Sequence, residues 1–511
     1  MENNNFDIII IGGGATGLGV AVDAQSRGYK TLLIEAYDFG KGASSKSTKL
    51  IHGGIRYLAN LDIQLVKEGL EERYFFLKNA PHLTKVQSYL VPFYSLYDKL
   101  KYFIGIKLYE FLSGKYKLGR SKFLSKQQTL TYENTSDLIE KNLIGGAIYY
   151  DGQFDDTRLL IALLRTFLDL GGHAYNYTEA RQILKNDAGI ANGILVYDKL
   201  NNITKKYYSE VIINATGVLT DTILDIDEPQ KMHHNITAAQ GTHLVFEKSI
   251  FNSPHALVIP KTTDKRVLFI LPWLDKIVVG TTDIKVDTPV IEPNATIDEV
   301  NFIMETLKQY TKQKVCHSDI KAKFTGLRPL VKQNNKKATK KISRKHKILC
   351  SESGLVSIVG GKWTIYRLMG EDTINYIIKK KLIENKGPSV TKNLQLFGYT
   401  TMNIEYPLKS YGSDYTKILD IQKELNNYEK LHDKLPYLQA EVIYHVRYEM
   451  AKTVEDILAR RTRFLFLDAR AAHESAPLVA KLMAYEFGFD NIWMNQQLEA
   501  FYIIAKNYFV P

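Results

Sequence analysis

Cysteine is scarce in this chain of 511 residues, which carries only Cys316 and Cys350. Neither belongs to a C-x-x-C pair, and no group of Cys and His residues has the spacing of a metal site. We therefore expect neither a disulfide framework nor a bound metal. Scarce cysteine of this kind is typical of a reducing, cytoplasmic compartment.

Long apolar stretches are also missing. No segment approaches the roughly 18 continuous apolar residues that a membrane-spanning helix needs. Residues 1–5 lack the basic and apolar regions of a secretory signal. We therefore expect a cytoplasmic protein that is soluble or lies on a membrane surface without crossing it.

Acidic residues are outnumbered, since 55 Asp and Glu face 67 Lys and Arg and leave a formal net charge of +12. A basic balance suits an anionic substrate, an anionic membrane surface or nucleic acid, and does not choose among them. The chain has no aromatic RNA-binding signature and no zinc-finger spacing, so we do not expect a nucleic-acid partner.

Apolar periodicity outlines the secondary structure. It predicts strands at residues 6–11, 30–34 and 355–359, and helices at 15–27, 62–80, 97–112 and 364–380. Two strand-rich blocks are predicted at about 194–215 and 241–283, the second with short alternating strands. After a polar junction the pattern is purely helical to the end. A chain of this length usually forms more than one domain. We expect a nucleotide-binding α/β domain, an interleaved second domain and a helical cap.

The first strand and helix are joined by a G-x-G-x-x-G motif, whose glycines are Gly12, Gly14 and Gly17. Gly12 permits a tight turn, Gly14 lets backbone amides approach a pyrophosphate, and Gly17 lets the helix pack closely. The helix N-terminus offers amides and a positive dipole end to phosphate. The expected phosphate-binding residues are Gly12, Gly14, Ala15, Thr16 and Gly17.

An acid follows this motif at the end of the second strand. Glu35 lies at about the separation expected of a residue that hydrogen-bonds a ribose hydroxyl. The motif and the acid together indicate a dinucleotide, but they do not separate FAD from NAD.

Residues 42–58 read GASSKSTKLIHGGIRYL. This segment closely resembles the S-S-x-S-(S/T)-K-L-I-H-G-G-(L/I)-R-Y-L signature of FAD-dependent glycerol-3-phosphate dehydrogenases and oxidases, in the D-amino-acid-oxidase-like flavoprotein group. Other stretches agree in order along nearly the whole chain. They are NATG at 214–217, GTH at 241–243, LPW at 271–273, GTTD at 280–283, GLRPL at 326–330, GGKWT at 360–364, RRTR at 460–463 and LDAR at 467–470.

The resemblance implies an α/β fold with three parts. A Rossmann-like FAD-binding domain is expected at 1–85, 146–235 and 346–390. An interleaved α+β substrate domain is expected at 86–145 and 236–345, and a helical C-terminal domain at 391–511.

The resemblance also implies that the flavin ring lies between the 42–58 segment and the turn at 360–364. The implied cofactor is FAD. Its expected contacts, beyond the glycine motif and Glu35, are Ser44, Thr48, Lys49, Leu50, Ala215, Gly217, Gly361, Lys362, Trp363 and Thr364.

The implied substrate is sn-glycerol 3-phosphate, whose phosphate needs cationic partners. Arginine forks suit phosphate oxygens, so Arg56, Arg328 and Lys362 are the foremost candidates and Arg344 is a weaker fourth. Tyr57 could add a hydroxyl contact.

Hydride transfer from C2 also requires a base for the C2 hydroxyl, and a neutral imidazole is the natural base near pH 7. We favour His52 over His243, and the other histidine would then orient the hydroxyl. Arg328 would stabilise the developing alkoxide.

The electron acceptor stays open between a membrane quinone and dioxygen. The oxidase branch often carries an extra insertion that is not obvious here, which favours the quinone. The aromatic and basic helix at 97–111 could lie in a membrane interface. Packing in the core with snorkelling lysines is the slightly preferred interpretation. A homodimer is possible.

Two observations leave room for other interpretations. The family usually carries acidic residues after 326–330, whereas residues 331–347 are rich in lysine and either touch lipid or form a solvated face. This departure puts the role of Arg344 in doubt. An amino-acid-oxidising flavoenzyme of the same fold is also possible, and it would need a carboxylate clamp in place of several cations.

Overall fold

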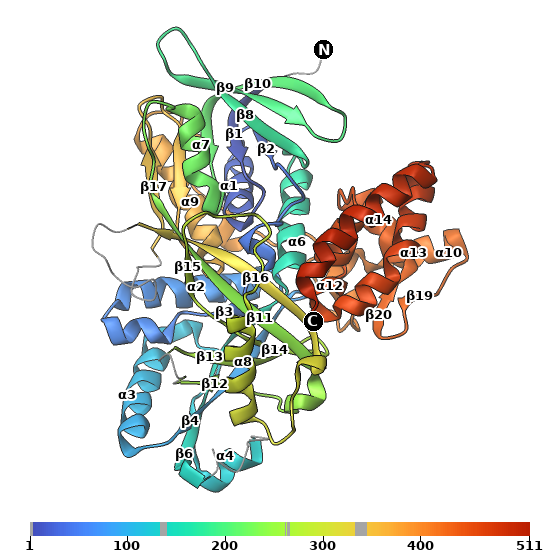
Figure 1. The fold of residues 1–511 in the computed structure, drawn as a ribbon. Coiled ribbons are helices and arrows are strands. Elements are labelled where there is room, and N and C mark those ends of the chain that lie inside the picture. Colours follow the sequence, from blue (N-terminus) through green and yellow to red (C-terminus); the bar gives the residue numbers. More distant parts are fainter. Residues whose placement is uncertain (1–3, 133–140, 261, 263–265, 333–344, 511) are drawn as a thin grey trace.

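The computed structural model describes residues 4–132, 141–260, 262, 266–332 and 345–510 (Figure 1). Two sheets form the body of the molecule, and the C-terminal helices pack to one side of it. The lysine-rich residues 333–344, with Arg344, lie outside the described residues, and so does the side chain of Arg56.

The first sheet has the strand order β17-β18-β10-β1-β2-β7, with β9 paired to β10 and β8 to β9. Strand β1 pairs in parallel with both β2 and β10, as the doubly wound topology requires. The strands are β1 (Asn5–Ile11), β2 (Thr31–Ile34), β7 (His173–Tyr175), β8 (Thr178–Lys185), β9 (Ala191–Asp198), β10 (Ile203–Asn214), β17 (Lys347–Cys350) and β18 (Val356–Val359).

Helices pack against this sheet because both of its faces are apolar. The residues of β1 from Ile8 to Ile11 are at most 4% exposed. The helices of this part are α1 (Ala15–Ser26), α6 (Asp156–Asp169), α7 (Thr220–Asp227) and α9 (Tyr366–Lys379). Helices α1, α6 and α9 cover one face of the strand, and strands β8 and β9 with helix α7 pack against the other. The predicted strand, helix and strand at the N-terminus are confirmed.

The second sheet is mostly antiparallel and follows the order β15-β11-β14-β13-β12-β4-β6-β3, with β16 paired to β11 and β5 to β6. Its strands are β3 (Leu50–Ile51), β4 (Thr84–Phe93), β5 (Lys122–Ser125), β6 (Gly145–Phe154), β11 (Ile236–Glu247), β12 (Ala256–Ile259), β13 (Leu268–Trp273), β14 (Lys276–Gly280), β15 (Ile284–Val286) and β16 (Ile320–Val331). The accompanying helices are α2 (Ile63–Asn79), α3 (Leu96–Ser113), α4 (Lys126–Tyr132) and α8 (Ile297–Tyr310). The expected α/β fold is therefore present, while the bounds of the six domain segments stay predictions.

The C-terminal region is helical except for one hairpin. Its helices are α10 (Tyr415–Leu425), α11 (Gln439–Tyr448), α12 (Phe464–Leu467), α13 (Ala469–Phe487) and α14 (Asn491–Ala505). Strands β19 (Lys430–His432) and β20 (Leu435–Leu438) pair with each other. The prediction of a purely helical pattern was wrong here, because strands of three and four residues are too short to show a two-residue period.

Helix α3 confirms the predicted helix at 97–112, but many of its apolar side chains are exposed. Leu100 is 60% exposed, Ile104 is 57% exposed and Phe111 is 79% exposed. Helix α3 therefore packs on the core along one narrow face, which centres on Ile106 and Tyr109, and its contact with a membrane stays a prediction.

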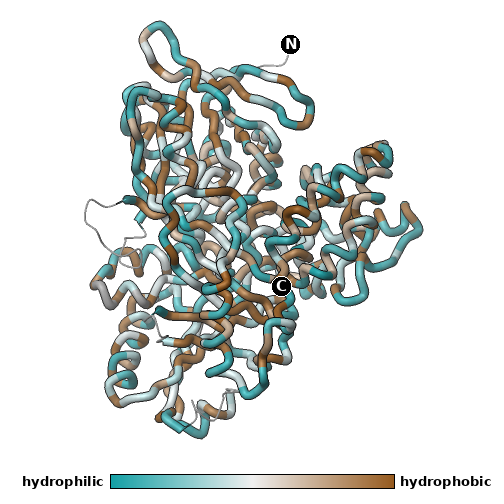
Figure 2. Tube along the Cα trace, in the orientation of Figure 1, coloured by the Kyte–Doolittle hydropathy of each residue, from teal (hydrophilic) through white to brown (hydrophobic). Residues whose placement is uncertain are grey.

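Apolar and polar stretches alternate along the whole trace (Figure 2). Among the described residues, no helix combines the length and the apolarity that crossing a membrane requires.

Candidate active site

The turn between β1 and α1 has the geometry of a phosphate-binding loop. Gly12 has φ +111°, and a Cβ there would lie 2.7 Å from the carbonyl oxygen of Ala215. A Cβ at Gly17 would lie 1.8 Å from the carbonyl oxygen of Gly12, so only glycine fits at either position. The N-cap residue of helix α1 is Gly14, which makes no side-chain cap hydrogen bond, and the Ala15 amide donates to the Ser44 hydroxyl instead.

Glu35 lies beside this turn, as its spacing predicts. One carboxylate oxygen accepts the Gly13 amide at 2.7 Å, and the other accepts the Tyr37 amide at 3.0 Å. Burial raises the pKa of Glu35, and the two backbone hydrogen bonds oppose that rise. The acid is therefore fixed against the glycine turn, and its contact with a ribose stays a prediction.

Three segments that are distant in sequence meet around Ser44. Its hydroxyl accepts the Ala15 amide at 3.0 Å, and its carbonyl oxygen accepts the Trp363 indole N–H at 2.9 Å. The His52 amide donates to the Thr364 hydroxyl at 3.2 Å. The glycine turn, the 42–58 segment and the 360–364 turn are thus brought together, as the family resemblance implies.

The NATG turn also closes on the glycine motif. The Ala215 amide donates to the Ile11 carbonyl at 2.8 Å, and Gly217 has φ +62°. Asn214 fixes the turn through side-chain hydrogen bonds to the Thr220 carbonyl and the Ser357 hydroxyl. Ala215 therefore borders the predicted dinucleotide site.

The amine of Lys49 is bound by other residues of the protein. The side chain is fully buried, and Nζ donates to Asp156 Oδ2 at 2.5 Å and to the Ser45 carbonyl at 2.9 Å. Burial lowers the pKa of Lys49 to about 7, while the charge of Asp156 opposes that change. Only the backbone of Lys49 is left for the predicted flavin contact.

His243 lies on β11 and reaches the 42–58 segment. Its Nε2 is 2.9 Å from the Thr48 hydroxyl, and its ring stacks on Phe324 with centroids 4.8 Å apart. The residue is 2% exposed, and its Nδ1 has no hydrogen-bond partner within the described part of the chain. Burial and then the positive charge of Arg328 lower the pKa of His243 well below its usual value, so its imidazole is neutral.

Arg328 lies on β16 beside the 280–283 turn. Its guanidinium donates to the Thr281 hydroxyl at 2.9 Å and to the Thr282 carbonyl at 3.2 Å. Its side chain remains 26% exposed. Both terminal nitrogens of the guanidinium are engaged, because Nη1 also pairs with Asp283 Oδ1 at 3.3 Å. Arg328 is therefore a restrained, partly exposed cation that already has a carboxylate beside it.

Lys362 lies near His52 and Tyr57. Its Nζ donates to the His52 carbonyl at 3.2 Å and is 5.2 Å from the Tyr57 ring centroid. These three predicted residues therefore form one group beside the 360–364 turn.

Sequence reasoning missed Glu299, a buried carboxylate behind the site. Its Oε1 accepts the hydroxyls of Thr242 and Thr282, and its Oε2 accepts the Gln240 amide. Glu299 thereby ties the GTH strand to the 280–283 turn. The Thr296-x-x-Glu299 capping box was the signal that could have revealed it.

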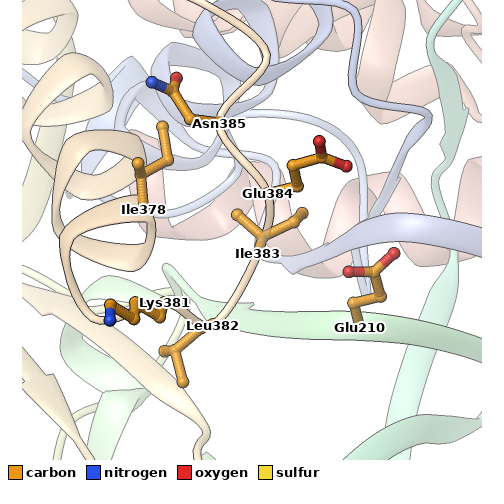
Figure 3. Close-up of a pocket in the computed structure, with 7 residues that line it drawn as sticks. All are labelled: Glu210, Ile378, Lys381, Leu382, Ile383, Glu384 and Asn385. Atoms are coloured by element: carbon orange, nitrogen blue, oxygen red, sulfur yellow. The ribbon is translucent and has the colours of Figure 1, made fainter.

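One surface pocket lies away from these residues. It has a volume of about 450 Å³ and is lined by Glu210, by Ile378 of helix α9 and by residues that follow this helix (Figure 3). It contains none of the predicted site residues and is open to solvent, so we assign it no role in the chemistry.

The chain matches known families over most of its length. Residues 7–367 match the FAD dependent oxidoreductase family, and residues 356–492 match the C-terminal domain of alpha-glycerophosphate oxidase.

Similar proteins of known name agree with these two family matches. A probable mitochondrial glycerol-3-phosphate dehydrogenase of Dictyostelium discoideum is 38% identical over 94% of this chain and 81% of its own length. The mitochondrial glycerol-3-phosphate dehydrogenase of Rattus norvegicus is 36% identical over 98% of this chain and 73% of its own length.

A solved structure extends the likeness to three dimensions. The glycerol-3-phosphate dehydrogenase of Bacillus halodurans, complexed with FAD, superposes with a TM-score of 0.80 at 27% identity and covers 99% of this chain and 96% of its own. The expected fold and the expected FAD cofactor are confirmed. The chain belongs to the family of FAD-dependent glycerol-3-phosphate dehydrogenases.

Proposed function

We propose that this protein oxidises sn-glycerol 3-phosphate at C2 to dihydroxyacetone phosphate and passes the electrons to a membrane quinone. The observation that carries the proposal is the meeting of the glycine turn, the 42–58 segment and the 360–364 turn next to cationic side chains and a neutral buried histidine. When bound, FAD supplies the acceptor for the hydride that leaves C2.

The cofactor would be held mainly by backbone. The first turn of α1 would offer the pyrophosphate its amides other than that of Ala15, which donates to Ser44, and Glu35 would accept a ribose hydroxyl. Ser44 and Trp363 are already hydrogen-bonded to the surrounding segments, so the site is largely preformed.

The substrate phosphate would be bound by Arg328 and Lys362, with Arg56 as a third cation. Arg328 is restrained by the Thr281 hydroxyl and the Thr282 carbonyl, which lowers the entropy lost when a phosphate binds. Several cations suit a phosphate that carries nearly two negative charges better than they suit an amino-acid carboxylate.

The C2 hydroxyl would lose its proton to His52, whose backbone is fixed on both sides by Thr364 and Lys362. His243 would orient the same hydroxyl, because its Nδ1 has no described partner and its ring is held neutral by burial. Arg328 would stabilise the developing negative charge on oxygen.

Helix α3 supports attachment to an anionic membrane surface. Its exposed apolar side chains are Leu96, Tyr97, Leu100, Phe103, Ile104, Leu108 and Phe111. Lys99, Lys101 and Lys107 are exposed on the same helix and complement anionic headgroups. An interfacial helix would bring the enzyme to a lipid-soluble quinone at the inner face of the cytoplasmic membrane.

The decisive experiment is anaerobic. Purified protein with FAD is mixed with glycerol 3-phosphate, glycerol or glycine while the absorbance of oxidised flavin is followed. Bleaching by glycerol 3-phosphate alone supports the proposal, and bleaching by glycine supports the amino-acid-oxidising alternative. The reduced protein is then mixed with a quinone analogue or with dioxygen, and the faster reaction identifies the acceptor.

A further inference from the structure

We propose that the C-terminal helical domain is part of the active-site apparatus, and that its Arg463 and Phe466 are positioning residues which hold His243 from two sides. The importance of His243 for the reaction rests on the proposed function. The holding contacts themselves rest only on the geometry that follows.

The first line of contacts starts at Arg463. Its guanidinium donates to the Ser45 carbonyl at 3.0 Å and to Asp156 Oδ1 at 3.2 Å. The other oxygen of Asp156 accepts the Ser47 amide at 3.1 Å, the Ser47 hydroxyl at 2.7 Å and Lys49 Nζ at 2.5 Å. Residues 45–49 are therefore wound around a single buried carboxylate that Arg463 holds from the far side.

Thr48 is the middle residue of this wound segment. Because Ser47 and Lys49 both bind Asp156, the backbone on either side of Thr48 is fixed. Its hydroxyl lies 2.9 Å from Nε2 of His243. The first line of contacts thus ends on one nitrogen of the His243 ring.

The second line is a stack of rings. Phe466 lies 5.0 Å from Phe324, and Phe324 is stacked on His243 at an interplanar angle of 14°. The guanidinium of Arg463 lies 4.1 Å from the centroid of Phe466, so both lines begin at one packed unit. The face of the His243 ring is therefore supported from the C-terminal domain as well.

Burial makes these contacts restrictive. Arg463 and Asp156 are fully buried, and Phe466 is 1% exposed. Close-packed side chains have little freedom to move. A cavity created at Phe466 would therefore let Phe324 shift, and the His243 ring stacked on Phe324 would shift with it.

Other buried ion pairs keep the C-terminal domain seated on the same segment. Arg461 forms a bidentate ion pair with Asp38, with N–O distances of 2.7 and 2.9 Å, and Lys41 pairs with Glu455 at 2.7 Å. Both partners in the N-terminal half directly precede residues 42–58. The domain therefore clamps the segment from its beginning to Lys49.

The proposal is tested first without catalysis, by modification of histidines with diethyl pyrocarbonate and mass spectrometry of the peptides. Phe466→Leu and Arg463→Lys should each increase the modification rate of His243 at least several-fold. His445, which is fully buried elsewhere in the C-terminal domain, should stay protected in both variants and reports any general unfolding.

Arg447→Ala is the matched control. Arg447 lies in the same domain and pairs with Glu424 and Glu486, and neither partner belongs to the 42–58 segment. His243 should remain as protected in this variant as in the unmodified protein. An unchanged His243 rate in both Phe466→Leu and Arg463→Lys overturns the proposal, whatever the substrate is.

The second readout is the anaerobic bleaching rate with saturating glycerol 3-phosphate. Phe466→Leu should lower this rate about tenfold with little change in KM, because a small misplacement of a reacting group is costly. In a His243→Ala background the same substitution should have little further effect. Equal losses in both backgrounds would show that Phe466 does not act through His243. Absence of bleaching in the unmodified protein would instead refute the proposed substrate and leave the modification result standing.

Discussion

At the scale of single residues, the two histidines of the site differ in what holds them. His243 is fixed through its ring by Thr48 and Phe324, whereas the described contacts of His52 with Thr364 and Lys362 are made by its backbone. The ring of His243 is thus held at one nitrogen and on one face, which suits the orienting role proposed for it.

His52→Gln should therefore retain FAD and lower the bleaching rate on the order of 10²-fold or more, the usual contribution of a general base. Bleaching with glycerol 3-phosphate and the flavin absorbance of the purified variant are the measurements. His255→Gln, at a histidine that contacts Ser88 away from the glycine turn, is the control. Near-normal bleaching in His52→Gln would remove His52 from the role of base.

Glu441 is a buried carboxyl whose burial raises its pKa to about 7, against hydrogen bonds from Tyr411 and the Leu438 amide. The folded state then holds this proton more tightly than the unfolded state, whose pKa is near 4.5. Glu441 therefore costs stability as the pH rises from about 4.5 to 7, and the full cost persists above 7. Glu441→Gln removes the ionisation and should stabilise the protein at pH 8 by about 1–3 kcal/mol, with little gain at pH 4.5. Thermal midpoints at the two pH values test this, and an equal shift at both would contradict it.

At the scale of elements, helix α3 shows why an amphipathic pattern does not reveal its partner. Its buried face carries Tyr109, whose hydroxyl accepts the Gly53 amide at 2.8 Å and donates to Asp151. Its opposite face exposes the apolar side chains named above. The apolar periodicity of the sequence identifies the helix. The same periodicity is expected whether a protein core or a lipid surface covers the exposed apolar face of α3.

A Leu100→Ser, Phe103→Ser double variant should weaken binding to vesicles that contain phosphatidylglycerol by at least tenfold, because it removes apolar area from the interface. Vesicle sedimentation measures the binding, and anaerobic bleaching should be unchanged. Ile190→Ser, at an exposed apolar residue of the turn between β8 and β9, is the control. Equal binding of all three proteins would show that α3 does not touch the membrane.

At the scale of the whole molecule, buried ion pairs join the C-terminal domain to the FAD-binding part. The guanidinium groups of Arg461 and Arg460 lower the pKa of Asp38 to about 2, although burial opposes this. The stabilisation is present above about pH 4 and is lost as the pH falls toward 2.

Asp38→Asn should destabilise the protein by about 3–5 kcal/mol near pH 7, because it leaves two arginines buried beside an uncharged group. Calorimetric or denaturant unfolding gives the measurement. Asp287→Asn, in an exposed pair with Lys285, should cost less than about 1 kcal/mol and is the control. A small effect of Asp38→Asn would mean that this ion pair does not hold the domains together.

The sequence alone determined the parts of the site whose chemistry is local. The glycine turn, Glu35 and the flavin-segment signature each lie within a few tens of residues, where backbone sterics and spacing decide the outcome. The helices at 62–80 and 97–112 were predictable for the same reason.

Only the tertiary structure decided which distant side chains converge. Thr48 and His243 are 195 positions apart, and Arg463 lies 418 positions from Ser45. Such pairs leave no periodic signal, because they form only after both sheets and the C-terminal helices have packed. The same packing directed the Lys49 amine to Asp156 and left one apolar face of α3 exposed. These contacts depend on burial and charge pairing in the assembled core, and no local sequence pattern encodes either of them.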